Sequence, residues 1–115
     1  MTRAERAQQL WSVLALAATN RQVLTYDIVA RLTGVHRPGL GDMLRPIQQY
    51  CTENNLPPLT VLVVSEQTGS PGEGFIGAAD IPTAQMRVFQ YPWLDTTAPT
   101  AEQFEAAYGH APDKR

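Results

Sequence analysis

The sequence predicts a mainly α-helical single domain that carries one small β-hairpin. Three observations predict this fold class: a length of 115 residues, apolar residues at helical spacing through the first half, and one β-branched run followed by a glycine-rich loop. A chain of this length corresponds to one ordinary domain. With 43% hydrophobic and 17% charged residues, it has enough apolar material for a single core and is not typical of a disordered chain.

The N-terminal segment predicts a first helix over residues 3–18. Its apolar residues recur at spacings of three and four, and Trp11 widens their stripe: Leu10, Val13, Leu14 and Ala17. The early positive charge and short apolar run also invite comparison with a signal peptide. Polar residues interrupt the run, however, and no clear small-residue cleavage site follows. We therefore expect the first helix of the mature domain.

A short second helix is expected in "YDIVARLTG". Thr25 offers an N-cap, Asp27 suits the positive end of the helix dipole, and Gly34 is placed to end the helix. The apolar residues expected to face the core are Ile28, Val29 and Leu32.

A turn, "VHRPGLG", separates this helix from a third one over about residues 40–53. The third helix has apolar residues at helical spacing: Leu40, Met43, Leu44, Ile47 and Cys51. Pro46 leaves two alternatives, a kinked helix or a break after Arg45 with a new segment beginning at the proline. Two helices joined by a tight turn after a first helix indicate a helix-turn-helix.

The β-branched run "LTVLVVS" predicts a strand, and "EQTGSPGEG" predicts a loop. The segment "FIGA" is the expected return strand, so the hairpin would form the wing of a winged helix-turn-helix. The loop lacks the Lys-Ser/Thr ending of a phosphate-binding P-loop. Glu73 at the tip of this loop would repel DNA. The acidic residues Glu66, Glu73 and Asp80 are scattered and do not form a pair of carboxylates suited to general acid–base catalysis.

The remaining residues, 81–115, are expected to be a C-terminal extension that packs on the winged domain of residues 1–80. In "DIPTAQMRVFQY", Asp80 or Thr83 could cap a helix, although the end of the run is also strand-like. "YPWLDTTAP" predicts a loop whose Tyr91 and Trp93 fold back on the core. "TAEQFEAAYG" predicts a short amphipathic helix that ends at Gly109, followed by a frayed tail.

Charge is unevenly distributed along the chain. Residues 1–45 carry six arginines and three acidic residues, a net of +3, whereas residues 46–115 carry three basic and eight acidic residues, a net of −5. A basic face is therefore expected only on the N-terminal half. An acidic protein can still bind DNA through such a local patch.

The cysteine content argues against a disulfide and against a cysteine-based metal site. Cys51 is the single cysteine, so no internal disulfide can form, and a cysteine-based zinc site is not expected. No apolar run approaches the roughly 20 residues that span a bilayer. We expect no cofactor, no metal, no membrane association and a cytoplasmic location.

"RQVLTYDIVARLTG" followed by "HRPGLGDML" resembles the winged-helix domain of O6-alkylguanine-DNA alkyltransferases and their non-catalytic alkyltransferase-like relatives. The resemblance covers roughly residues 8–80, with "NNLPPLTVLVVSEQTG" in the place of the active-site strand and wing. The residues in register with the family pattern are Tyr26, Ala30, Gly34, Leu40 and Gly41.

Departures from the family pattern argue against alkyl transfer. Thr60 stands where the resemblance places the reactive cysteine, and Val61 and Leu62 replace the neighbouring His and Arg. A thiolate activated by a histidine is what that chemistry needs. Pro38 stands where the family has the arginine that enters the base stack, with Arg37 beside it.

Two functional hypotheses follow, and an enzyme is not expected because no nucleophile–base pair or metal cluster is visible. The first is a non-enzymatic winged-helix protein that binds duplex DNA, with these contact residues: Tyr26, Arg31, His36, Arg37 and Arg45. The second is a protein-interaction or regulatory module that has a winged-helix scaffold but no longer binds DNA. It would bind a protein partner through Tyr91, Trp93 and Phe104. Each DNA candidate also has an ordinary structural interpretation, as a packed tyrosine or a solvated surface charge.

Overall fold

The computed structural model describes residues 1–72 and 80–109. Within these ranges the helices and strands follow in this order: α1 (Arg3–Thr19), β1 (Leu24–Thr25), α2 (Tyr26–Thr33), α3 (Leu40–Glu53), β2 (Val63–Val64), α4 (Ile81–Gln90) and α5 (Ala101–Gly109). Short 3-10 helices lie between them: η1 (Arg37–Gly39), η2 (Leu59–Leu62) and η3 (Trp93–Asp95). The predicted mainly helical fold is confirmed. The small sheet among the described residues pairs β1 with β2 in parallel and is not the predicted hairpin.

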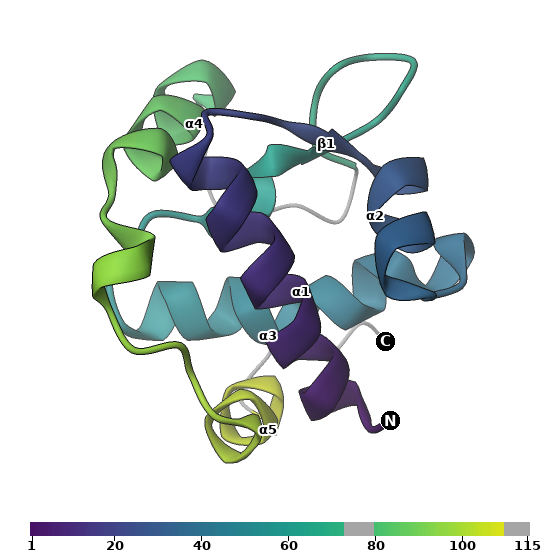
Figure 1. Cartoon of the computed structure of the whole chain (residues 1–115), viewed down its shortest axis with the longest axis vertical. Helices are drawn as coiled ribbons and strands as arrows, with labels where there is room; N and C mark the ends of the chain where they lie inside the picture. The colour runs from purple at the N-terminus through teal and green to yellow at the C-terminus, as the bar shows by residue number, and fades with distance from the viewer. Residues whose placement is uncertain (73–79, 110–115) are drawn as a thin grey trace.

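Helix α1 is the central element of the fold. It crosses the front of the molecule in Figure 1, with α3 behind it, α5 below, α2 to the right and α4 to the upper left. All four of these helices contact it. Its start is fixed by a reciprocal capping box, in which Thr2 Oγ1 accepts from Glu5 N (3.1 Å) and Glu5 Oε1 accepts from Thr2 N (2.7 Å).

An aromatic cluster joins α1 to the C-terminal segment. The Trp11 ring lies 5.4 Å from that of Trp93 and 5.8 Å from those of Tyr50 and Phe104. Trp93 is 2% exposed and Phe104 is fully buried, so the predicted folding-back of Trp93 on the core is confirmed. The expectation that a partner binds through Trp93 and Phe104 is wrong, because both rings are used inside the core. Of that trio only Tyr91 is partly exposed.

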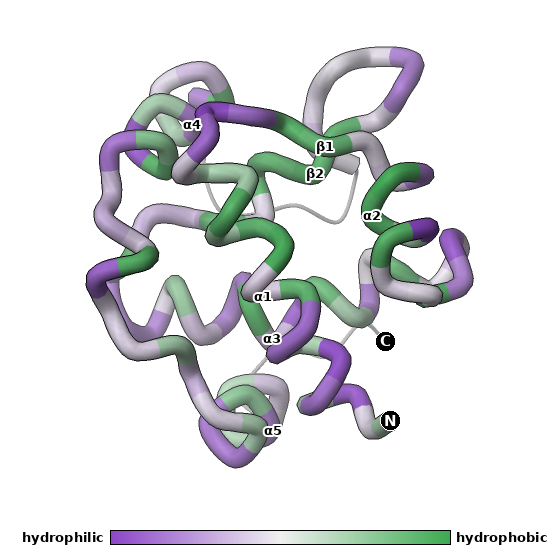
Figure 2. The backbone as a smooth tube through the Cα atoms, in the orientation of Figure 1, coloured by the Kyte–Doolittle hydropathy of each residue, from purple (hydrophilic) through white to green (hydrophobic). Residues whose placement is uncertain are grey.

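Hydrophobic segments of the backbone also meet in the interior of the fold (Figure 2). In Figure 2 the green segments of β1, β2 and the middle of α1 meet inside the molecule, while purple marks the N-terminal end of α1. The described part of the chain contains no helix that is long and apolar enough to cross a membrane.

Helix α2 begins and ends where the sequence predicts. Thr25 Oγ1 accepts from Ile28 N (3.2 Å), and Gly34 adopts the left-handed conformation with φ 75°. The predicted buried face is partly wrong. Val29 is buried, but Ile28 and Leu32 are 45% and 60% exposed. The face of α2 that meets the core consists instead of Val29, Ala30 and Thr33.

Helix α3 continues through Pro46 without a break in its residue range. A proline removes one intrahelical N–H and crowds the preceding turn. The Pro46 side chain is fully buried, between buried Leu44 and Ile47. Its packing against the core therefore offsets the lost hydrogen bond, and the alternative of a second segment beginning at Pro46 is wrong.

The strand predicted over residues 59–65 is mostly not a strand. Residues Leu59–Leu62 form the 3-10 helix η2, all of it buried, and only Val63–Val64 is extended. Periodicity alone cannot separate a buried strand from a buried helical turn in a short apolar run. The two residues of β2 pair in parallel with β1, Leu24 opposite Val63 and Thr25 opposite Val64.

The expected return strand "FIGA", with Glu73, lies outside the described residues. The described start of the loop is a tight turn, in which Ser65 N donates to Ser70 O and Gly69 N donates to Ser65 O, both at 2.9 Å.

The C-terminal segment folds as two helices over the core. Asp80 caps α4, as one of the predicted alternatives holds, and its carboxylate accepts from Thr83 N (3.2 Å) and Thr83 Oγ1 (2.9 Å). The strand-like end of this run is helical. Helix α5 packs against α1 and α3 through buried Phe104 and Ala107.

Candidate functional site

The segment between α2 and α3 is exposed and carries one arginine, Arg37. Gly34 ends α2, and η1 then leads directly into α3 at Leu40. Three consecutive residues of this segment, His36, Arg37 and Pro38, are exposed. We refer to residues 34–39 as the turn.

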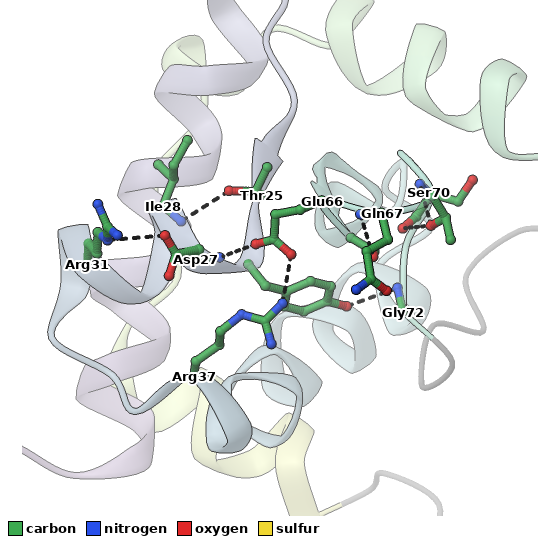
Figure 3. A network of polar contacts seen from close by, with 12 residues as sticks. Thr25, Asp27, Ile28, Arg31, Arg37, Glu66, Gln67, Ser70 and Gly72 are labelled. Atoms are coloured by element: carbon green, nitrogen blue, oxygen red, sulfur yellow. Dashed lines mark hydrogen bonds and ion pairs between the residues drawn. The ribbon is translucent and has the colours of Figure 1, made fainter.

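Arg37 makes the main contact between the turn and the loop that follows β2. Its Nη2 donates to Glu66 Oε2 at 2.7 Å, and the other oxygen of that carboxylate, Oε1, accepts from the backbone N–H of Asp27 at 2.9 Å. Asp27 N belongs to the first turn of α2, whose N–H groups have no partner within the helix. Glu66 therefore bridges a guanidinium and a helix N-terminus, as Figure 3 shows.

Tyr26 makes a second contact with the same loop. Its hydroxyl accepts from the backbone N–H of Gly72 at 3.0 Å, and its ring centroid lies 5.9 Å from Arg37 Cζ. A Cβ on Gly72 would lie 2.6 Å from the tyrosine Oη. A side chain at position 72 would therefore require the Tyr26 ring to shift. Together with Asp27, these residues form what we call the turn cluster: Tyr26, Asp27, Arg37, Glu66 and Gly72.

Arg31 lies at the edge of the turn cluster. Its Nε is 3.1 Å from Asp27 Oδ2, one helical turn away, and its side chain is 80% exposed. In Figure 3, Asp27 lies between Arg31 and Glu66, so two acidic residues lie side by side with Arg31 and Arg37 on either side of them. Exposed pairs of this kind contribute only about 0–1 kcal/mol and exchange readily with solvent ions.

Arg45 lies in a different environment. Its Nη1 is 3.6 Å from Asp42 Oδ1, its Cζ is 5.6 Å from the Tyr108 ring centroid, and its side chain is 19% exposed. Arg3 stacks on the same ring at 4.0 Å and pairs with Asp42 at 3.2 Å. We call these residues the α3–α5 cluster: Arg3, Asp42, Arg45 and Tyr108. The structure thus brings Tyr26, Arg31, His36 and Arg37 to one region and holds Arg45 in another.

The electrostatics of the turn cluster favour an ionised Glu66. Backbone hydrogen bonds, first from Asp27 N and then from the N–H of Glu66 itself, hold the pKa of the Glu66 carboxyl below its ordinary value of 4.5, and the hydrogen bond and charge of Arg37 add a smaller lowering. The carboxylate is therefore charged at neutral pH and neutralises Arg37 in the free protein.

Thr60 and Cys51 lie in environments without visible nucleophilic activation. Thr60 is 4% exposed within η2, and its Oγ1 has no hydrogen-bond partner among the residues that the structure describes. Burial raises the pKa of the Cys51 thiol to about 12, which disfavours the reactive thiolate at neutral pH. Across residues 1–72 and 80–109, no three metal-ligating side chains come together.

Glu66 and Gly72 are the site residues that the sequence does not reveal. They follow Asp27 and Tyr26 by 39 and 46 positions, and Glu66 follows Arg37 by 29. No local spacing relates residues so far apart. The glycine-rich composition of the loop is the one signal that points toward a close backbone approach.

Comparisons with protein families, curated proteins and solved structures gave no significant match to this chain.

Proposed function

We propose that the chain is a non-enzymatic DNA-binding protein with a winged helix-turn-helix arrangement like that of the alkyltransferase-like proteins its sequence resembles. In this proposal α2 is the support helix, α3 the recognition helix, and the loop after β2 the start of the wing. The observation that carries the proposal is the exposed turn, where His36 and Arg37 stand at the start of η1, which leads into α3. A helix-turn-helix contacts DNA around the start of its second helix.

The phosphate contacts are assigned to the turn and to α2. The exposed guanidinium groups of Arg31 and Arg37 both lie beside the first turn of α2. Arginine at such a position binds backbone phosphate and fixes the register of the protein on the duplex. Tyr26 holds the loop against this surface through Gly72, so we assign it a positioning role.

Arg45 is given a structural role in place of the DNA contact that the sequence predicts. It is largely covered and shares Asp42 and Tyr108 with Arg3. The uncharged residues Gln48 and Thr52, which are partly or fully exposed on α3, lie in the second half of this helix, so we assign no base contact to them.

An absence of catalysis is part of the proposal. Support comes from Thr60 at the acceptor position of the alkyltransferase resemblance and from the raised pKa of Cys51. A single buried cysteine also suits a reducing compartment, and we infer a cytoplasmic location from it.

A salt-dependent titration tests the proposal. Fluorescence anisotropy of a labelled mixed-sequence duplex gives the dissociation constant between about 50 and 200 mM salt, where phosphate-contacting proteins lose affinity steeply. Arg37→Ala is expected to lower the salt slope by about one. Arg87→Ala is the matched control, since Arg87 is also exposed but lies on α4, across the molecule from α2. Absence of binding at low salt, or an equal loss in both variants, would contradict the proposal.

A second candidate function is a protein-interaction module. The exposed pair Ile28 and Leu32, one turn apart on α2, favours it, since apolar side chains on an open helix face are typical of docking surfaces. The same titration separates the candidates. A protein that uses only this face gives no DNA binding at low salt.

A further inference from the structure

Glu66 occupies the position that an anionic ligand of the turn would take. Its two oxygens accept from Arg37 Nη2 at 2.7 Å and from Asp27 N at 2.9 Å. A guanidinium beside a helix N-terminus is suited to a phosphate oxygen as well as to a carboxylate. The protein thus places one of its own carboxylates where Arg37 would meet DNA.

The contact is exchangeable. The side chains of Arg37 and Glu66 are 50% and 37% exposed, and ion pairs in that position are weak and screened by salt. The position of the loop after β2 does not depend on Glu66 alone. Gly72 N donates to the Tyr26 hydroxyl, and residues 65–70 of the loop are closed by their own backbone hydrogen bonds. Glu66 can therefore release Arg37 while the loop stays attached to α2.

We propose that Glu66 is an autoinhibitory residue that competes with backbone phosphate for Arg37. In the free protein its carboxylate neutralises the turn, and on binding a DNA phosphate replaces it at the guanidinium. This inference rests on the proposed DNA-binding function. It predicts that DNA affinity is limited by an internal anion, and that removal of the charge of Glu66 strengthens binding.

Glu66→Gln tests the inference. The amide keeps an oxygen for Asp27 N and loses the charge that holds Arg37. With the labelled duplex at about 50 mM salt, the dissociation constant is expected to fall about two- to fivefold, the range that an exposed ion pair supports. An equal thermal unfolding midpoint for the wild type and the variant shows that the fold is retained.

Two controls separate competition from a general loss of negative charge. Glu105→Gln removes the same charge from exposed Glu105 on α5, at the opposite end of the molecule from the loop after β2, and is expected to leave the dissociation constant unchanged within about 1.5-fold. In an Arg37→Ala background, Glu66→Gln is expected to have less than half of its effect, because the competed guanidinium is gone.

The outcomes distinguish the two proposals. Binding by the wild type with unchanged or weaker binding by Glu66→Gln overturns autoinhibition and leaves DNA binding intact. A full effect of Glu66→Gln in the Arg37→Ala background also overturns it. If neither the wild type nor any variant binds the duplex at low salt, the proposed function fails, and autoinhibition fails with it.

Discussion

The turn cluster and the α3–α5 cluster use arginine in opposite ways. Arg37 extends from an exposed turn to a carboxylate on an exposed loop, and half of its side chain is open to solvent. Arg45 is 19% exposed and shares the Tyr108 ring and the Asp42 carboxylate with Arg3. The first arrangement leaves a cation that a phosphate can reach. The second uses its cations to attach α5 to α1 and α3.

This difference explains why charge along the chain is an incomplete guide to a binding face. The N-terminal 45 residues have a net charge of +3, yet part of that charge serves packing. What separates exposed Arg37 from covered Arg45 is the element that packs over the second, α5. The four predictions below test this separation, beginning with the largest expected effect.

Phe104→Ala is expected to break the packing under the α3–α5 cluster. The ring is fully buried against Trp11 and Tyr50, at centroid distances of 5.8 and 5.7 Å. Truncation of a buried phenylalanine lowers the free energy of unfolding by about 3–5 kcal/mol. Urea denaturation measures the loss. Glu105→Ala, an exposed change on the same helix, is the control, and a loss below 1 kcal/mol for Phe104→Ala would refute this anchoring role.

Arg45→Ala and Arg37→Ala are expected to differ in stability. Loss of the Arg45 stem and its contact with Tyr108 should lower the free energy of unfolding by about 1–2 kcal/mol. Arg37→Ala should change it by less than about 0.5 kcal/mol, since its ion pair is exposed. Parallel urea denaturation of the two variants checks the difference. Equal losses would remove the distinction between the two clusters.

Tyr26→Phe is expected to weaken the attachment of the loop to α2. The variant leaves Gly72 N without its acceptor, which should cost about 0.5–1.5 kcal/mol. Gly72→Ala disturbs the same contact, because its Cβ would lie 2.6 Å from the Tyr26 Oη. Thermal unfolding of both variants and of the double variant should therefore show a combined loss smaller than the sum. Additive losses would show that the two residues act separately.

The smallest effect concerns pH. The pKa of Glu66 is lowered in the folded protein, first by Asp27 N, then by the backbone N–H of Glu66 itself, and less by Arg37. Its stabilising contribution is therefore present above the ordinary value of 4.5 and is lost as pH falls through the lower folded value.

Carboxyl carbon chemical shifts give the pKa of Glu66 directly. Because the Asp27 hydrogen bond is the larger cause, Arg37→Ala should return the pKa only part of the way to 4.5. A pKa at or above 4.5 in the wild type would show that the bridge does not form in solution.

The sequence predicts local features of this fold well and long-range ones poorly. Thr25, Gly34 and Asp80 end or begin helices as expected, because each capping interaction spans only a few residues. The buried face of α2 and the 3-10 helix at Leu59–Leu62 were not predicted correctly. Both depend on which side of a short apolar segment meets the rest of the core.

In the candidate site, too, the sequence predicts the local features but not the long-range contacts. The exposed turn with His36 and Arg37 follows from turn-forming residues between two helical patterns. The pairing of Arg37 with Glu66 does not, since it requires the parallel contact of β1 with β2 to bring the loop beside α2. The covering of Arg45 likewise depends on where α5 packs.

The salt dependence of duplex binding for Arg37→Ala and Arg45→Ala is the most direct test of the proposed difference between the clusters. If Arg37 binds phosphate and Arg45 stabilises the fold, the slope of log K against log salt falls by about one for Arg37→Ala and stays at the wild-type value for Arg45→Ala. Equal slopes for the wild type and Arg37→Ala, or a reduced slope for Arg45→Ala alone, would contradict this difference.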